Sequence, residues 1–446
     1  MNLKEVIKKF IPEFLLRFYH YLLALIGAFL YRFPSRDLFV IGVTGTSGKS
    51  SVVEMSAEVL RKAGYKTASL SSIRFKIDGE EWENKLKMTM PGRFKIQRFL
   101  RKAVDKGCRY AVLEVTSEGI KQFRHKFINF KTAVFTNLSP EHIESHRGFE
   151  NYKNAKIKLF KSAKKVHIIN LDDKYADSFL KVPAEKKILF SLGLKDKNEF
   201  KGGKNFKIVR AEDIREEREG ISFKINNIDF NLKLHGRFNV SNALCAVCVG
   251  LSEGVSLEVC KKALEGMNDI PGRMEIVIKE PFTVVVDYAH TPTALEKVYK
   301  TVLNFKKENS DLICILGACG GGRDKWKRKV FGQIAGRFCQ KIILTNEDPY
   351  DEDPQEILEM IKPGVFKEGF PLSNFFEILD RRKAISKGLS LAKEGDVVVI
   401  TGKGCEPWMC VKDGKKIPWD DRDIVREEFD KLKISSEKQK ESGLKN

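Results

Sequence analysis

The sequence predicts an α/β protein with two domains, each built on a mainly parallel sheet. Short apolar runs alternate with stretches of helical spacing, and each apolar run ends in a Gly-rich or polar turn. The chain has 446 residues, enough for about three domains or two large ones. Its apolar fraction of 42% is ordinary for a globular protein and excludes wholesale disorder.

Residues 1–36 differ from the rest and predict a helical leader. A basic start is followed by the aromatic-rich run FLLRFYHYLLALIGAFLYRF. The 14 uncharged residues from Phe18 to Tyr31 would span about 21 Å as a helix, short of the ~30 Å hydrocarbon core, so crossing a bilayer is disfavoured. Packing against the next domain and lying on an anionic membrane surface both stay open. The second alternative is supported by the cations Lys4, Lys8, Lys9, Arg17, Arg32 and Arg36.

The central domain is predicted over 37–271. It begins with the buried strand LFVIGVTG and the helix SSVVEMSAEVLRKAGY. The same alternation continues through the strands CRYAVLEV, TAVFTNL and KVHIINLDD, which favours a parallel sheet covered on both faces. An alternating, more antiparallel piece, ISFKINNIDFNLKL, precedes the helix SNALCAVCVGLSEG.

A second α/β series is predicted over 272–432. Its four strands are TVVVDYAH, LICILGAC, KIILTNED and DVVVITGKG, and each runs into a polar or Gly-rich turn. Because ligands collect at the carboxyl ends of parallel strands, we expect a site at these turns. The tail 433–446 is polar, and we expect it to be disordered.

The balance of 80 Lys and Arg against 60 Asp and Glu gives a net charge of +20, which predicts anionic partners. A nucleotide, a phosphorylated or carboxylate substrate, nucleic acid and a membrane surface all satisfy this. Nucleic acid is disfavoured because the cations are dispersed and no nucleic-acid-binding motif occurs.

Cysteine usage indicates a reducing compartment. The nine cysteines are an odd number and lie mainly in apolar segments, so we expect buried thiols rather than a disulfide framework. Cys245 and Cys248 form a CxxC in a helical run; core packing is the favoured interpretation, with a metal or redox role as the alternative. No cleavable signal follows the apolar stretch, and we expect a cytoplasmic protein.

The strongest local motif is TGTSGKSS at 44–51, between a predicted strand and a predicted helix. Glycines let the backbone approach phosphate oxygens, the helix start offers free N–H groups, and Lys49 adds a mobile cation. Ser50 is placed to bind Mg²⁺. The eight-residue P-loop would need glycine at Val43, so this loop is a shorter variant. An accidental Gly-rich turn is the alternative, and the strand–loop–helix context disfavours it.

Other candidates are weaker when taken alone. Glu114 ends a buried strand, where a P-loop protein needs its metal ligand. Taken alone, a Glu at a strand end is more often a solvated turn residue, but the neighbouring phosphate loop favours the metal-ligand role. His142 and Lys156 can be a cap and a solvated lysine. Asn239 and Asn242 can merely cap a helix. A site role is favoured for the residues that follow a C-terminal strand, Asp287, Tyr288 and His290.

Together these stretches resemble the Mur ligase family of ATP-dependent amino-acid ligases, closest to the branch that adds the third residue to the muramoyl dipeptide. The similarity covers about 37–430, and its motifs are specific through their order and spacing. They are TGTSGKSS, LEVTSEG, FTNLSPEHIESH, NAKIKLF, NLDD, HGRFNVSNA, PGRME, DYAHTP, GACGGGRDKWKR, GKGCEPW and DDR. The resemblance implies a central P-loop ATPase domain plus a C-terminal Rossmann-like α/β domain. The usual N-terminal UDP-binding domain of the family is expected to be missing.

The resemblance also assigns roles, residue by residue. ATP phosphates and one Mg²⁺ would be held by Gly45, Thr46, Ser47, Gly48, Lys49 and Ser50, with Glu114 as a further ligand. A second Mg²⁺ would be held by His142 and a carbamylated Lys156. Adenine would contact Asn239 and Asn242, while Arg273 and Asp287 would reach phosphate and ribose. The muramoyl-peptide acceptor would be gripped by Thr89, Thr116, Gln122 and Arg124. The incoming amino acid would meet Arg323, Asp348, Tyr350, Gly402 and Glu406.

Several positions depart from the family pattern. A Thr-Thr pair is Thr89-Met90 here, SSH is 116–118 TSE, and GKGHE is 402–406 GKGCE. The DNPR loop of diaminopimelate-adding members is 347–350 EDPY. Tyr350, in an acidic loop, thus stands in place of the Arg that would suit a distal carboxylate. We therefore expect an amino acid with a cationic or neutral side chain, with lysine as the first choice.

The predicted function is an ATP-dependent carboxylate–amine ligase that extends a muramoyl-peptide precursor through an acyl phosphate. Two alternatives stay open. A folylpolyglutamate-synthase-like ligase would share the fold and turn over with folate and glutamate. A non-catalytic, membrane-associated P-loop switch would release no amino-acid-dependent phosphate.

Overall fold

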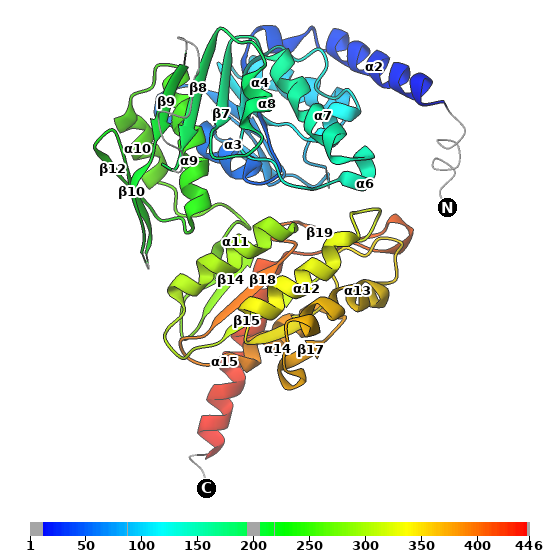
Figure 1. Ribbon diagram of the computed structural model, residues 1–446, viewed down its shortest axis with the longest axis vertical. Helices are drawn as coiled ribbons and strands as arrows, with labels where there is room; N and C mark the ends of the chain where they lie inside the picture. Colours follow the sequence, from blue (N-terminus) through cyan, green and yellow to red (C-terminus); the bar gives the residue numbers. More distant parts are fainter. Residues whose placement is uncertain (1–11, 87, 194–205, 218, 444–446) are drawn as a thin grey trace.

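The computed structural model describes residues 12–86, 88–193, 206–217 and 219–443. Its elements form two α/β bodies that lie one above the other in Figure 1. The central and C-terminal boundaries, 37–271 and 272–432, remain predictions. The strands of the two large sheets divide between Arg210 of the first sheet and Glu275 of the second.

The first sheet has nine strands in the order β4-β3-β2-β5-β1-β6-β7-β8-β9. From β2 to β9 all neighbours are parallel, whereas β3 and β4 pair antiparallel at one edge. The strands are β1 (Phe39–Thr44), β2 (Thr67–Leu70), β3 (Arg74–Ile77), β4 (Glu80–Glu83), β5 (Tyr110–Glu114), β6 (Phe130–Phe135), β7 (Val166–Asn170), β8 (Lys186–Ser191) and β9 (Phe206–Arg210).

Helices cover both faces of this sheet because its central strands are apolar on both sides. One face packs on α3 (Lys49–Lys62), α9 (Arg237–Ser252) and α10 (Leu257–Glu265). The other packs on α4 (Arg93–Asp105), α7 (Phe149–Ser162) and α8 (Ala176–Leu180). The short α5 (Ser117–Lys121) and α6 (Ile143–His146) follow β5 and β6. A small antiparallel sheet comprises β10 (Glu212–Glu217), β11 (Gly220–Ile225) and β12 (Ile228–Leu232).

The second sheet has the order β13-β14-β18-β15-β16-β17, parallel except for β13. Its strands are β13 (Glu275–Ile278), β14 (Thr283–Asp287), β15 (Leu312–Leu316), β16 (Lys341–Leu344), β17 (Phe375–Glu377) and β18 (Val397–Thr401). One face packs on α11 (Pro292–Val302), α12 (Trp326–Phe338) and α13 (Pro354–Lys367), the other on α14 (Arg381–Leu391) and α15 (Asp421–Gly443). β19 (Trp408–Cys410) and β20 (Lys416–Pro418) form a hairpin.

Two sequence expectations are wrong. α15 continues to Gly443, where a disordered tail was expected from residue 433. Cys314 on β15 and Cys339 after α12 form a disulfide, although thiols were expected. The strand and its following helix bring their Cα atoms to 6.1 Å. Cys245 and Cys248 are buried thiols in α9, as core packing predicts.

The leader contains α2 (Glu13–Leu30), which lies along the upper body in Figure 1; residues 1–11, with Lys4, Lys8 and Lys9, lie outside the described part. Ala24 and Ala28 are buried, and α2 contacts α4. The packed alternative is therefore correct for this inner face. The exposed outer face consists of Phe14, Leu15, Phe18, Tyr19, Tyr21, Leu22, Leu25, Ile26, Phe29 and Leu30. Within the described residues, no helix combines the length and apolar character needed to cross a membrane.

A fully buried ion pair fixes α15 to the second body. Arg381 donates to both carboxylate oxygens of Asp421 at 2.8 and 2.7 Å, and both side chains have 0% exposure. Because Asp421→Asn removes the anion and leaves the guanidinium buried, we expect a loss of about 3–5 kcal/mol in the free energy of unfolding. Urea denaturation measures this loss. Arg382→Ala breaks the exposed pair with Glu427 next door and should cost about 0–1 kcal/mol. Equal losses in the two variants would contradict the prediction.

Candidate active site

The loop 44–51 joins β1 to α3 at the carboxyl edge of the first sheet. Gly48 has φ 80° and precedes α3. A Cβ on Gly48 would meet Asn242 Oδ1 at 2.4 Å, and one on Gly45 would meet Thr136 Oγ1 at 1.9 Å. Both positions therefore require glycine, and the first N–H groups of α3, which have no acceptor within the helix, suit an anion at this loop.

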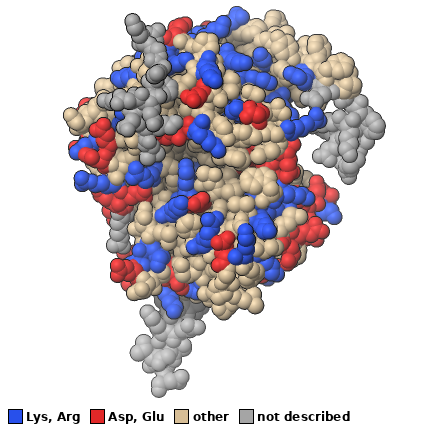
Figure 2. All heavy atoms as spheres, in the orientation of Figure 1, with Lys and Arg blue, Asp and Glu red and all other residues tan. Residues whose placement is uncertain are grey.

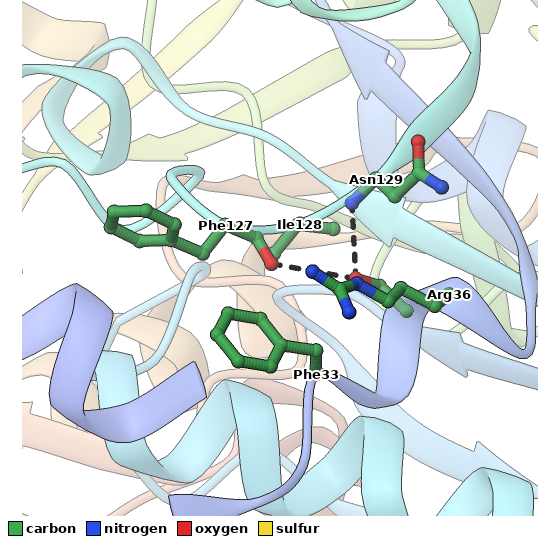
Figure 3. Close-up of a pocket in the computed structure, with 6 residues that line it drawn as sticks. Phe33, Arg36, Phe127, Ile128 and Asn129 are labelled. Carbon is green, nitrogen blue, oxygen red and sulfur yellow. Dashed lines mark hydrogen bonds between the residues drawn. The ribbon is translucent and has the colours of Figure 1, made fainter. Parts of the chain in front are cut away.

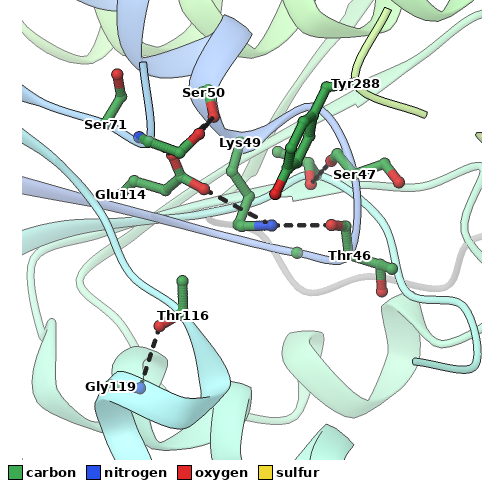
Figure 4. Close-up of polar contacts among 12 residues, drawn as sticks. Thr46, Ser47, Lys49, Ser50, Ser71, Glu114, Thr116, Gly119 and Tyr288 are labelled. Atoms are coloured by element: carbon green, nitrogen blue, oxygen red, sulfur yellow. Dashed lines mark hydrogen bonds and ion pairs between the residues drawn. The ribbon is translucent and has the colours of Figure 1, made fainter. Parts of the chain in front are cut away.

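Lys49, Ser50 and Glu114 lie together, as Figure 4 shows. Ser50 Oγ donates to Glu114 Oε2 at 2.7 Å, and Lys49 Nζ is 3.8 Å from Glu114 Oε1. The backbone N–H of Ser72 also donates to Glu114 Oε2. Glu114 comes here because β5 pairs with β1 and sets Glu114 opposite Val43. Burial lowers the pKa of Lys49, and the nearby Glu114 opposes that shift.

Lys156 approaches the same loop from α7. Its Nζ donates to the backbone oxygen of Gly45 at 2.6 Å, and the side chain is 2% exposed. Burial, followed by repulsion from Lys49, holds the Lys156 pKa well below its usual value. Tyr152, also of α7, contacts both Lys156 and the loop: its ring centroid is 4.5 Å from Nζ, and its hydroxyl hydrogen-bonds to Thr46 Oγ1.

His142 lies at the start of α6 and faces the second body. Its Nδ1 is 3.4 Å from a guanidinium nitrogen of Arg323. Burial, and then the positive charges of Arg323 and Lys156, lower the His142 pKa to about 2. The imidazole is therefore neutral at ordinary pH and retains a lone pair that can bind a cation.

The two predicted adenine-contacting residues form one buried unit in α9. Asn242 Nδ2 donates to Asn239 Oδ1 at 3.0 Å, and Asn239 Nδ2 donates to the backbone oxygen of His235. Asn242 lies against Gly48, so this pair borders the phosphate loop.

Arg273 reaches into this site from the second body. It donates to Ser72 Oγ at 3.3 Å, and its guanidinium lies 4.4 Å from the Tyr288 ring centroid. Asp287 ends β14 but accepts backbone N–H bonds from Met274 and Ala289, which gives it a structural role at this turn.

The loop predicted to bind the incoming amino acid is less acidic than its sequence indicates, because cations from other segments pair with several of its acids. Lys403 Nζ is 2.9 Å from Asp348 and 3.1 Å from Glu406. Arg328 pairs with Glu352 at 2.8 Å. A Cβ on Gly402 would meet Glu347 Oε2 at 2.3 Å. Burial and the neighbouring Asp348 raise the pKa of Glu347 to about 7.

Two of the predicted acceptor residues, Gln122 and Arg124, contact each other just after α5, and Arg124 reaches the segment that contains a third, Thr89. Arg124 donates to Gln122 Oε1 at 2.8 Å and to the backbone oxygen of Met90, next to Thr89. Thr116 caps α5 by accepting from the Gly119 N–H, as Figure 4 shows.

The contacts between the two bodies were not predicted from the sequence. Lys327 Nζ is 3.4 Å from Glu141 Oε1, with side-chain exposures of 2% and 5%. Asp324 accepts from the N–H groups of Ile143 and Glu144 at the start of α6. The motifs around Glu141 and Lys327 were visible as sequence, but only the fold pairs them.

The donor set fits Mg²⁺ that is shared with phosphate. Within the described residues no group of three or more His, Cys, Asp or Glu side chains is placed to hold a metal by itself. Ser50 and Glu114 offer two hard oxygen donors at one point. Mg²⁺ prefers such incomplete sets, which phosphate oxygens and water complete.

Fold and site together define a two-body P-loop enzyme whose phosphate loop faces a second α/β unit. Family comparison identifies the same two units: the Mur ligase middle domain matches 43–250, and the Mur ligase glutamate ligase domain matches 272–404. The chain belongs to the Mur ligase family, whose members are ATP-dependent ligases that use Mg²⁺. The predicted fold class and family are thus confirmed.

Among the relatives in sequence are ligases named for muramoyl-peptide substrates. A UDP-N-acetylmuramoyl-L-alanyl-D-glutamate–2,6-diaminopimelate ligase from Clostridium tetani is 36% identical over 92% of this chain and 81% of its own. A UDP-N-acetylmuramyl-tripeptide synthetase from Roseiflexus sp. covers 90% of this chain and 80% of its own at 35% identity.

Solved structures of related ligases have the same fold. A 2,6-diaminopimelate ligase of the same name shares 31% identity over 89% of this chain and 79% of its own, with a TM-score of 0.59. Folylpolyglutamate synthase from Mycobacterium tuberculosis, at 18% identity and TM-score 0.64, covers 88% of this chain and 92% of its own and shares the fold alone.

Proposed function

We propose that this ligase uses ATP to join a free amino acid to the peptide carboxylate of a muramoyl-peptide precursor of peptidoglycan. The main supporting observation is that Lys49, Ser50 and Glu114 lie together in the first body, and that Arg273 of the second body donates to Ser72, whose hydroxyl hydrogen-bonds to Ser50. The relatives' names support the acceptor class. Because the reaction consumes ATP, we propose a cytoplasmic location.

The reaction needs activation because a carboxylate has no adequate leaving group. Transfer of the γ-phosphoryl group to a carboxylate oxygen gives an acyl phosphate and ADP. The amine then attacks the acyl carbon and inorganic phosphate leaves. Lys49 and Arg273 neutralise charge on the transferring group, and contact between the two bodies excludes water.

Two Mg²⁺ ions are proposed, which would lend positive charge to the phosphates. Ser50 and Glu114 would hold one. His142 and the carbamate of Lys156 would hold the other. The carbamate forms when the neutral Lys156 amine bonds to the carbon of CO₂ and loses a proton, and a depressed pKa favours that neutral amine.

The remaining roles follow the family pattern and are part of the proposal. Asn239 and Asn242 would contact adenine, while Asp287 would reach ribose. The acceptor would contact Thr89, Thr116, Gln122 and Arg124, and the amino acid would contact Arg323, Asp348, Tyr350, Gly402 and Glu406.

The test is phosphate release with ATP, a muramoyl-dipeptide acceptor and each amino acid in turn. We expect release only when acceptor and amino acid are both present. Folate plus glutamate serves as the rival pair, and turnover with that pair alone would overturn the proposal. Phosphate release at the same rate with and without the amino acid would indicate a nucleotide switch.

Lysine is the expected amino acid, rather than the diaminopimelate named for the relatives. A distal carboxylate needs a cation, and Tyr350 stands where the family's diaminopimelate pattern has Arg. Lys403 and Arg328 already pair with acids of this loop, so Tyr350 and the buried Glu347 are the residues that favour a cationic side chain. Tyr350→Arg should shift the kcat/KM ratio toward meso-diaminopimelate by roughly tenfold or more. Preference of the unaltered enzyme for meso-diaminopimelate would contradict this inference.

A further inference from the structure

α2 has two unlike faces. On the inner face, the small residues Ala24, Gly27 and Ala28 are buried, and a Cβ on Gly27 would already touch the α4 backbone at 3.6 Å. The outer face carries large side chains that remain in solvent, with Phe18 at 64% and Phe29 at 74% exposure. Exposed apolar surface of this extent marks an interaction site.

Cations border this outer face at its N-terminal half. Arg17 of α2, Lys126 after α5, and Lys158 and Lys161 of α7 are all exposed. They lie close enough to repel: burial, and then the charges of Arg17, Lys126 and Lys161, lower the Lys158 pKa. In Figure 2 blue atoms of Lys and Arg lie beside the tan atoms at the upper right, where Figure 1 places α2.

Further cations follow the C-terminal end of α2. Arg32 is exposed, and the Arg36 guanidinium lies 4.5 Å from the Phe33 ring centroid. Arg36 and Phe33 line a cavity of about 210 Å³ together with Phe127, shown in Figure 3. Ser35 holds this turn in place by donating to the backbone oxygen of Phe127 and accepting from the Asn129 N–H. An acid, Asp37, also lies beside this end, 3.9 Å from Arg101.

We propose that the outer face of α2 binds an anionic lipid bilayer as a helix lying in the membrane plane. The apolar side chains would enter the headgroup boundary, and the bordering cations would meet lipid phosphates. The inner face already packs on α4, so only the outer face is available to lipid. A symmetric pair of chains joined through α2 would instead bring two like-charged borders together, which disfavours a second copy as the occupant.

Flotation of the full chain with lipid vesicles tests this. We expect binding to vesicles that mix phosphatidylcholine with phosphatidylglycerol, little binding to phosphatidylcholine alone, and loss of binding at high salt. Phe18→Glu with Phe29→Glu should lower the bound fraction by roughly tenfold or more. The matched control is Leu372→Glu in the C-terminal body, which is 73% exposed and should float unchanged.

A second pair of variants tests the charge. Lys158→Glu with Lys161→Glu should weaken binding, whereas Lys412→Glu with Lys416→Glu, an equal charge change in the C-terminal body, should not. All these positions are exposed, and thermal unfolding verifies that each variant folds. Equal flotation of the α2 variant and its control would overturn the proposal. The proposal would also be overturned if sedimentation showed a dimer that depends on α2 while the chain did not bind vesicles. Phosphate release with a soluble acceptor should persist in every variant, which separates this proposal from the proposed reaction.

Discussion

Lys156→Ala is expected to lose turnover by roughly a hundredfold or more while still binding ATP nearly normally. Lys156 is buried against the Gly45 backbone oxygen rather than placed among the loop amides that would hold phosphate. Its proposed carbamate would supply an anion that alanine cannot replace. Nucleotide titration and phosphate release measure the two effects separately.

The control lies one helical turn away on α7. Lys153 pairs with Glu150 at the surface, so Lys153→Ala should keep its rate. Removing dissolved CO₂ should slow the unaltered enzyme, and added bicarbonate should restore it. Because protonation of the amine opposes carbamate formation, the bicarbonate requirement should grow as pH falls. A short carboxylic acid should partly rescue Lys156→Ala. An unchanged rate in Lys156→Ala would remove the metal-holding role.

Lys327→Ala is expected to lower kcat strongly by weakening the contact between the two bodies. Lys327 donates to the backbone oxygen of His290 at 3.0 Å and pairs with the buried Glu141. Glu141 Oε2 has no hydrogen-bond partner among the described residues, so removing Lys327 leaves a buried acid without its ion-pair partner. The closed arrangement should lose about 3–5 kcal/mol, a factor of roughly a hundred or more in its population.

Small-angle scattering with and without ATP measures the closure, and initial rates measure kcat. Adding Glu141→Gln to Lys327→Ala should partly restore both the closure and kcat, since the double variant no longer buries an unpaired charge. Burial raises the pKa of Glu141, so lowering the pH should also relieve the single variant. Full closure and full rate in Lys327→Ala alone would show that this pair does not hold the bodies together.

The local parts of the site could be predicted from the sequence. A strand, a Gly-rich turn and a helix are contiguous, so 44–51 is recognisable as a phosphate loop. Glu114 needed one further step, the pairing of two strands, which buried parallel strands permit. The resemblance supplied the other residues, whose roles stay predictions.

Long-range contacts could not be predicted. Whether Lys327 meets Glu141 depends on how two bodies approach, and spacing along the chain does not encode that. The acidic appearance of 347–352 was misleading for the same reason, since Lys403 and Arg328 come from distant segments. The disulfide between Cys314 and Cys339 likewise depends on how a helix packs on its strand.

One contact of α2 links two processes thermodynamically. Tyr21 packs edge-on against Phe123, with 6.1 Å between ring centroids, and Phe123 lies between Gln122 and Arg124 of the proposed acceptor site. If lipid binding shifts α2, it shifts this loop, and the coupling free energy is the same in both directions. If vesicles increase the affinity of the enzyme for its acceptor by some factor, the acceptor increases the affinity of the enzyme for vesicles by the same factor. The enzyme would thus concentrate at the bilayer when its acceptor is abundant and leave it when the acceptor is spent.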